Sequence, residues 1–307
     1  MIVVCGETLI DLVHVDGEFW RANATAALAR LGTSTAMLAR ISGDAFGGRL
    51  RERLADNGID LRYVLTASEP STVAVVDLDE SGGARYSFYL RETADWQWTV
   101  TSLPVDFDDS VTTLHAGSMA LFMPPGGVAL EAMLTRERAH RVISIDPNVR
   151  AAICPDPLRY REVVERWLRV AHIVKASADD VGWLYPDRPL TDVLLDWSQR
   201  GPSVVAITLG ADGVVARTAG GELVQVPGVP VDVVDTIGAG DTFSAALLHA
   251  LEALECLDVE KLAGLTAAQL EVALRYAISA SAVSCTRAGA DPPYGQDLPP
   301  VRALFAE

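Results

Sequence analysis

The chain reads Asp235-Thr236-Ile237-Gly238-Ala239-Gly240-Asp241-Thr242-Phe243 at the point where an apolar run becomes a helical pattern. The apolar run covers residues 229–234, and the helical pattern covers residues 245–254. The two glycines allow a tight turn and a close approach to a ligand, because they lack a Cβ. The stretch therefore predicts an extended segment that turns sharply into a helix, a unit typical of α/β folds.

This turn has the chemistry of an anion site. The N–H groups of Gly238, Ala239 and Gly240 would lie at a helix N-terminus, where the helix dipole favours negative charge. A carboxylate beside an anion makes sense if Asp241 takes a proton from a nucleophile that attacks that anion. The alternative is that Asp241 only caps the helix. The length of the full string favours the catalytic interpretation.

Strand-like and helix-like segments alternate along the rest of the chain. This order predicts an α/β fold with a mostly parallel sheet and helices on both faces. The expected strands are residues 2–5, 35–39, 112–115, 142–145, 172–174 and 204–208. The expected helices are residues 22–31, 46–57, 128–139, 158–170, 190–199, 245–254 and 267–286.

One segment departs from this alternation. Residues 72–78 and 84–90 have the pattern of two strands, and Asp-Glu-Ser-Gly-Gly at 79–83 supplies a turn, so we predict a β-hairpin. The alternatives are an edge hairpin of the main sheet and a separate lid. Its insertion before the central strands favours the lid.

The charge balance argues against nucleic acid and anionic membranes as partners. The chain has 41 acidic and 25 basic residues, a formal charge of −16, and no basic cluster. Its four cysteines are scattered, which predicts neither a zinc site nor a disulfide framework. No apolar run approaches the about 20 residues of a membrane span, and the N-terminus lacks a signal-peptide pattern. We therefore expect a cytoplasmic protein.

Several motifs, in order and spacing, resemble the PfkB (ribokinase-like) family of carbohydrate kinases. Besides residues 235–243, they are Gly-Glu-Thr-Leu-Ile-Asp-Leu at 6–12, Gly-Asp-Ala-Phe-Gly at 43–47, Asp-Pro-Asn-Val-Arg at 146–150, Thr-Leu-Gly-Ala-Asp-Gly at 208–213 and Cys-Thr-Arg-Ala-Gly-Ala at 285–290. The resemblance implies one ribokinase-like domain over residues 1–307, a three-layer α/β/α fold. It also implies a small β lid formed by about residues 12–20 and 62–98, and a homodimer through that lid.

The resemblance further implies ATP and Mg²⁺ as cofactors and a sugar as the second substrate. Asp241 would be the catalytic base, and Gly238, Ala239 and Gly240 the anion hole. The sugar would be bound by Asp11, Asn23, Arg91, Asn148 and Arg150. From the residues alone, Asp11 fits a turn about equally well, Arg150 a salt bridge, and Arg91 an exposed edge position.

The chain departs from the family pattern just before Asn23. Relatives carry a glycine pair there, whereas residues 18–23 read Glu-Phe-Trp-Arg-Ala-Asn. Either this protein lacks the glycine loop or residues are missing from the sequence at this point, and the abrupt run favours the second. Loss of the loop would weaken sugar binding.

For the nucleotide, the resemblance implies a set of residues at later strand ends: Lys175, Ser177, Asp180, Thr208, Gly210, Gly213 and Ile278. Ser177 also fits the N-cap of a following helix, and both roles are compatible. Asp180 replaces the usual Glu, and its shorter side chain favours a water-bridged role at Mg²⁺. Without the family, Gly210 and Gly213 would indicate only an ordinary turn.

The family pattern also implies a K⁺ ion beside the anion hole. The matching positions, which would bind mainly through backbone carbonyls and one carboxylate, are Asp235, Ile237, Ser284, Arg287 and Gly289. Without the family, Arg287 would be a basic residue that complements a helix C-terminus.

Fructose is the expected sugar, because the motifs at 6–12 and 146–150 and His-Ala-Gly-Ser at 115–118 resemble bacterial fructokinases. The alternatives are a 2-keto-3-deoxygluconate kinase and a ribokinase-type kinase, although ribokinases carry Asn where this chain has Leu9. A third alternative is a catalytically silent sugar- or nucleotide-sensing protein on the same fold. Intact Asp241 argues against the sensor, whereas the missing glycines and Ile278 favour it.

Replacing Asp11 with Ala should raise the KM for sugar far more than the KM for ATP. The reason is that each lost hydrogen bond to a charged group is worth about 1.5–3 kcal/mol. Steady-state kinetics with each substrate varied in turn measures this. An unchanged sugar KM would leave Asp11 as a turn residue only.

Overall fold

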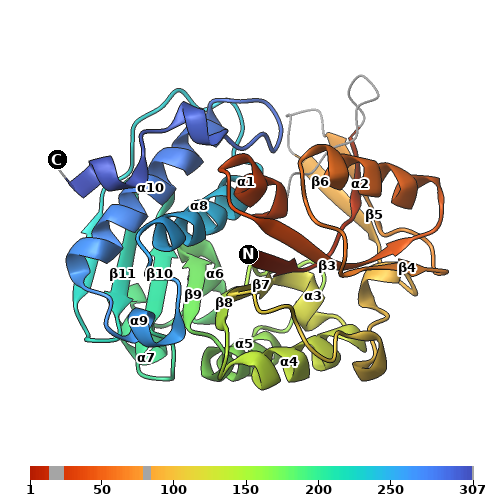
Figure 1. Ribbon diagram of the computed structural model, residues 1–307, viewed down its shortest axis with the longest axis horizontal. Coiled ribbons are helices and arrows are strands. Elements are labelled where there is room, and N and C mark those ends of the chain that lie inside the picture. Colours follow the sequence, from red (N-terminus) through yellow and green to blue (C-terminus); the bar gives the residue numbers. More distant parts are fainter. Residues whose placement is uncertain (14–23, 79–83, 306–307) are drawn as a thin grey trace.

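The computed structural model describes residues 1–13, 24–78 and 84–305. Its central strands are β1 (Ile2–Cys5), β3 (Thr35–Ser42), β4 (Val64–Ala67), β7 (Thr113–Gly117), β8 (Val142–Asp146), β9 (Ile173–Ser177), β10 (Val204–Thr208), β11 (Val214–Thr218) and β12 (Leu223–Val226). They form a nine-stranded sheet in the order β12-β11-β10-β9-β8-β7-β1-β3-β4 (Figure 1). The pairs from β4 to β10 are parallel, and β11 and β12 add an antiparallel edge. The predicted mostly parallel sheet is confirmed.

Helices cover both faces of this sheet, as predicted (Figure 1). The α-helices are α1 (Ala24–Arg30), α2 (Ala45–Asp56), α3 (Ser118–Phe122), α4 (Gly126–Glu137), α5 (Pro157–Val170), α6 (Ala178–Leu184), α7 (Leu190–Ser198), α8 (Ala239–Ala253), α9 (Val259–Ala263) and α10 (Ala267–Cys285). Short 3-10 helices are η1 (Ala94–Trp96), η2 (Val100–Ser102), η3 (Gly210–Asp212), η4 (Gly295–Asp297) and η5 (Val301–Phe305).

The central strands are apolar on both sides because each side packs on a helical layer. In β1, Ile2 and Val4 belong to the core shared with α1, α8 and α10. The alternate residues Val3 and Cys5 belong to the core shared with α4, α5 and α7. This two-residue period is the geometry of a strand, and it makes Cys5 a buried core thiol.

A second, three-stranded sheet lies beside the β3–β4 end of the large sheet (Figure 1). It consists of β2 (Ile10–Val13), β5 (Val73–Leu78) and β6 (Ala84–Tyr89), in the order β2-β5-β6. The antiparallel β5–β6 pair confirms the predicted hairpin. The parallel β2 was not predicted, because a four-residue strand has little periodicity of its own.

The expected lid boundary at residues 62–98 is too wide. Within that range, β4 pairs with β3 as an edge strand of the large sheet, and η1 packs against β3. Only β5 and β6 of this range belong to the small sheet. The reason is tertiary: a short strand joins whichever sheet edge offers free backbone partners.

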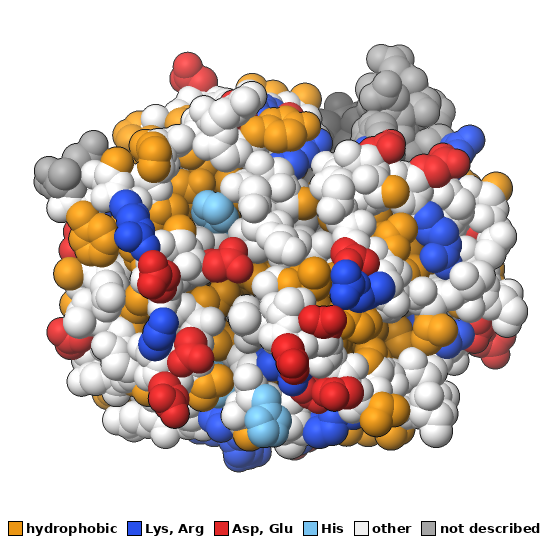
Figure 2. All heavy atoms as spheres, viewed as in Figure 1, with side chains coloured by type: hydrophobic (Ala, Val, Ile, Leu, Met, Phe, Trp, Pro, Cys, Tyr) orange, Lys and Arg blue, Asp and Glu red, His pale blue; other side chains and the backbone are white. Residues whose placement is uncertain are grey.

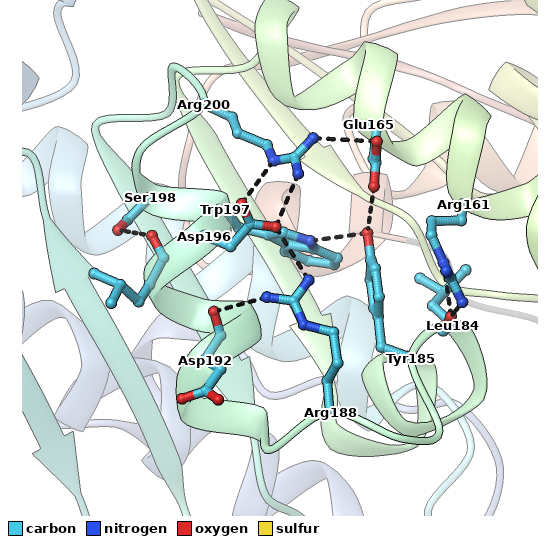
Figure 3. A network of polar contacts seen from close by, with 11 residues as sticks. Arg161, Glu165, Leu184, Tyr185, Arg188, Asp192, Asp196, Trp197, Ser198 and Arg200 are labelled. Carbon is cyan, nitrogen blue, oxygen red and sulfur yellow. Dashed lines mark hydrogen bonds and ion pairs between the residues drawn. The ribbon is translucent and has the colours of Figure 1, made fainter.

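The side chains between α5 and α7 form a polar network (Figure 3). Arg200 pairs with Glu165 at 3.1 Å and with Asp196 at 3.0 Å. The Tyr185 hydroxyl donates to Glu165 at 3.1 Å and accepts from Trp197 Nε1 at 3.4 Å. These partly exposed pairs contribute little individually, so we interpret the network as a connection between two outer helices.

The surface carries charges of both signs. Figure 2 shows acidic and basic side chains intermixed over the face that it presents, with apolar atoms between them. Within the described residues, no helix is both long and apolar enough to cross a membrane.

A buried carboxylate joins the small sheet to the large one. Asp95, in η1, accepts a bond from the backbone N of Thr8 at 2.7 Å and another from the Thr72 hydroxyl. Thr8 and Thr72 stand just before β2 and β5, so both chain crossings into the small sheet meet at Asp95. Burial raises the pKa of Asp95, although its hydrogen bonds act in the opposite direction.

Replacing Asp95 with Ala should lower the free energy of unfolding by about 2–4 kcal/mol, because Thr8 N and the Thr72 hydroxyl lose a buried partner. Asp95→Asn should cost less, since an amide resembles the neutral carboxyl that burial favours. Urea unfolding measures both, with exposed Asp109→Ala as the control. A wild-type midpoint for Asp95→Ala would contradict this role.

Candidate active site

The turn before α8 is closely packed and left-handed. Gly238 has φ 77° and is the N-cap of α8. A Cβ at this position would lie 2.8 Å from the Ala290 Cβ, so a side chain is excluded by both conformation and space. The helix therefore begins at Ala239 and not at residue 245 as predicted, because the glycine turn itself forms the first helical turn. This start places Asp241 in the first turn of α8.

The N–H groups of this turn are not all available. Ala239 N donates to Thr236 O at 3.2 Å, so an anion would compete with this bond. The Ala239 carbonyl accepts from the Ser281 hydroxyl of α10 at 3.0 Å. The turn is thus held in place by α10 as well as by its own backbone.

Asp241 opens into a cavity at the carboxyl ends of β1, β7 and β8. Parallel sheets place ligands at such ends. Its polar lining includes Asn148 and Arg150, as the sequence predicts, together with Glu7. The remaining lining residues are Val4, Cys5, Gly6, Thr8, Leu9, Ala24, Ala26, Met37, Leu50, Arg53, Leu54, Asn57, Ile59, His115, Ala116, Gly117, Ser118 and Asp146.

A buried ion pair lies directly behind this cavity. Lys175 Nζ donates to Asp146 Oδ2 at 2.9 Å, and both side chains are 7% exposed. Burial alone would lower the pKa of Lys175, but Asp146 and, more weakly, Asp180 and Asp241 raise it. A Cβ at Gly240 would lie 3.1 Å from Lys175 Nζ. The ammonium group therefore lies beside the glycine turn as a fixed positive charge.

The loop after β8 is held by carboxylates on both sides. Asp146 Oδ1 accepts from Asn148 N at 3.2 Å, and Asp180 Oδ1 accepts from Val149 N at 2.8 Å. Asp180 Oδ2 also bonds to the backbone and hydroxyl of Ser177 in a capping box. The N-cap alternative for Ser177 is confirmed, while the role of Asp180 at Mg²⁺ stays a prediction.

Two titratable groups at this cavity are shifted by burial. Burial raises the pKa of Glu7 to about 7, and the charge of Asp95 adds to the rise. Burial lowers the pKa of His115 to about 4, and its Nδ1 lies 3.0 Å from Ser144 Oγ. His115 therefore lines the cavity as an uncharged imidazole at pH 7, whereas the Glu7 carboxyl gains or loses its proton near neutral pH.

Among the described residues, the predicted sugar residue Arg91 does not line this cavity. Arg91 is exposed and lines a separate hollow with Trp96, Gln97 and Met123. The backbone of Asp11 lies in β2 of the small sheet. Asn23 and the adjoining break in the glycine pattern lie outside the described residues.

The predicted nucleotide loop follows β10. Gly210 and Gly213 both have positive φ, 60° and 99°. A Cβ at Gly213 would lie 2.1 Å from Val226 O, so this glycine is required by packing against the chain itself. Gly210 has open space on that side, as a ligand approach requires. Thr208 Oγ bonds to Ala176 O at 3.4 Å, and Ile278 is a core residue of α10 with 7% exposure.

Two residues of the expected cation site, Ile237 and Gly289, bond to the carboxylate of a third, Asp235. Asp235 accepts from Ile237 N at 2.9 Å and from Gly289 N at 3.0 Å, which joins the two loops. Ser284 is buried beside Thr242 at 3.5 Å. The guanidinium of Arg287 pairs with Asp297 at 3.0 Å, away from this carboxylate.

Glu7, Ser118 and Asp146 lie within the motifs at 6–12, 115–118 and 146–150, but those motifs alone indicated no role for them. All three follow or end strands of the large sheet, and that position is the signal that could have singled them out. Their burial and partners depend on chain segments distant in the sequence.

Comparison with known proteins agrees with this geometry. The pattern described as "pfkB family carbohydrate kinase" matches residues 21–296. A fructokinase of Rhizobium leguminosarum bv. trifolii is 37% identical over 276 residues, 86% of this chain and 84% of that protein. A Xylella fastidiosa fructokinase solved with bound ATP has a TM-score of 0.86 at 24% identity, covering 99% and 98% of the chains. A Vibrio cholerae O395 fructokinase double mutant, with fructose, ADP and a potassium ion, has a TM-score of 0.81 at 25% identity, covering 99% and 97%.

The match over residues 21–296, the identity to a curated fructokinase and the shared fold agree with one another. The expected ribokinase-like three-layer fold is confirmed. The chain belongs to the pfkB family of carbohydrate kinases, and it is a phosphotransferase that acts on a sugar hydroxyl.

Proposed function

We propose that this chain is an ATP-dependent fructokinase with Asp241 as its general base. The observation that carries the proposal is the position of Asp241, in the first turn of α8 and at the cavity that also contains Asn148 and Arg150. The relatives named fructokinase support fructose as the sugar.

The reaction would follow from these positions. A sugar hydroxyl loses its proton to the Asp241 carboxylate, and its oxygen attacks the γ-phosphorus of ATP. The bond from that phosphorus to the bridging oxygen breaks, and ADP leaves with the electron pair. The glycine turn and Lys175 would stabilise the charge that develops on the phosphoryl oxygens. Asn148 and Arg150 would orient the sugar, which is most of what phosphoryl transfer asks of a protein.

Cations would assist at two places. Mg²⁺ bound with ATP supplies neutralisation of phosphate charge, and carboxylates such as Asp180 are suitable oxygen ligands for it. The Asp235 carboxylate and neighbouring carbonyls suit K⁺, and Arg287 does not fill that position because it pairs with Asp297. The potassium ion in the Vibrio cholerae structure supports this assignment.

An assay of ADP release over a panel of sugars tests the proposed function. The panel contains fructose, 2-keto-3-deoxygluconate, ribose and glucose, each with ATP and Mg²⁺. The proposal expects the highest kcat/KM for fructose. A preference for 2-keto-3-deoxygluconate or ribose would change the substrate, and sugar binding without ADP release would identify a sensor.

Replacing Asp241 with Asn should lower kcat by about 10²–10⁴-fold, because general-base help is worth that much. ATP binding should change little and the fold should persist, since a half-buried first-turn acid contributes at most about 2 kcal/mol to a helix. The matched control is Asp187→Asn, at an exposed position away from the cavity. Near wild-type kcat in Asp241→Asn would remove Asp241 from the mechanism.

K⁺ should raise kcat severalfold relative to Na⁺ or choline at equal ionic strength. The ion would hold the loops around Asp235 and Gly289 together, and those loops position the glycine turn. Asp235→Asn should lose this stimulation, so that its rates in K⁺ and in choline are equal. A rate that is independent of K⁺ throughout a titration would contradict the cation site.

A further inference from the structure

Ser118 occupies a backbone conformation that suits glycine better than serine. It is the first residue of α3, directly after β7, and its φ is 51°. A non-glycine residue in this left-handed region is strained, because its Cβ lies too close to the following carbonyl oxygen. The preceding residue, Gly117, is required by packing, because a Cβ there would lie 2.0 Å from Asp146 O. The chain therefore holds a serine where the turn itself favours glycine.

The hydroxyl of Ser118 adds a second cost. The residue is 8% exposed, and among the described residues its Oγ has no hydrogen-bond partner. A buried hydroxyl without a partner is unfavourable, because it has lost its hydrogen bonds to water. Alanine would remove this cost, and glycine would remove both. Strain and unpaired polar groups of this kind concentrate at functional sites.

Ser118 lines the cavity that contains Asp241. Its Oγ is enclosed in the present rotamer, but rotation about the Cα–Cβ bond moves it, because serine has a single side-chain torsion. The segment thus offers a hydroxyl that can both donate and accept a hydrogen bond.

A second polar group of the same cavity is anchored to the same helix. Glu7 Oε2 accepts from Ala120 N at 3.1 Å, two residues after Ser118. Glu7 is half-buried, and the charge of Asp95 raises its pKa while that of Arg150 lowers it. The backbone N–H of Glu7 also bonds to this carboxyl group. Glu7 follows β1 and Ser118 follows β7, whereas Asp241 lies in α8.

We propose that the Ser118 hydroxyl and the Glu7 carboxyl form a subsite for one sugar hydroxyl, different from the hydroxyl that is phosphorylated. Asp241 serves the reacting hydroxyl, so the new subsite sets the orientation of the ring and the selectivity among sugars. The inference rests on the proposed sugar-kinase function of the cavity. The opposing account is that Ser118 is only a turn residue.

Kinetics of Ser118→Ala separates the two accounts. The subsite predicts a kcat/KM for fructose about 10-fold lower, with the KM for ATP within about twofold. The melting temperature should stay equal or rise, because an unpaired buried hydroxyl is removed. Ser118→Gly should lose the same sugar discrimination and gain more stability. The control is Ser198→Ala on α7 (Figure 3), where the hydroxyl bonds only within its own helix.

Monodeoxy analogues of fructose identify the hydroxyl that is bound. Wild type should discriminate against one analogue by about 10-fold, and Ser118→Ala should treat that analogue and fructose alike. Glu7→Gln, which keeps an acceptor for Ala120 N, should reduce discrimination against the same analogue. If fructose is not the substrate, the preferred sugar of the panel and its deoxy analogues take its place.

The outcomes separate the subsite from the proposed function. Normal wild-type turnover with unchanged kcat/KM in Ser118→Ala for every analogue would overturn the subsite alone. Sugar binding without turnover moves the same comparison to calorimetric Kd values, where equal values for wild type and Ser118→Ala again overturn it. A wild type that neither binds nor phosphorylates any sugar of the panel would overturn both proposals.

Discussion

The buried ion pair between Asp146 and Lys175 is the constraint on which the active-site region depends. Asp146 Oδ2 also accepts from Ser244 at 3.1 Å, one turn after Asp241 on α8. One carboxylate thus joins β8 and β9, the loop that begins at Asn148, and the helix that carries the proposed base Asp241. Removing either partner would leave an isolated buried charge, which typically costs 3–5 kcal/mol.

This arrangement explains how a chain with a net charge of −16 can bind an anionic nucleotide. Lys175 is enclosed beside the glycine turn, so solvent screens its charge little. The N-terminus of α8 adds a partial positive charge at the same place. The wider surface mixes both signs (Figure 2). In the proposed reaction, attraction for the phosphates would therefore be local, which lets the rest of the surface stay acidic.

The left-handed turns at Gly238 and Ser118 differ in a way that sequence alone does not explain. At Gly238 the close contact with Ala290 leaves no room for a side chain. At Ser118 a side chain is kept although the conformation favours glycine and its hydroxyl is unpaired. The small sheet reaches the same region through Asp95, which holds the chain just before β2 and β5. The proposed sugar subsite at Ser118 and Glu7 and the attachment of the small sheet at Asp95 thus lie in the same region.

The sequence alone determined the α/β alternation, the β5–β6 hairpin and the glycine turn around Asp241. These features depend on local periodicity and on contiguous motifs, which are visible without coordinates. Tertiary structure alone decided that β4 joins the large sheet, that Arg91 lines a separate hollow, and that Gly213 is needed for packing. It also decided the roles of Glu7, Asp95 and Ser118. Burial and unpaired hydrogen-bonding groups arise where distant segments meet, so no local pattern records them.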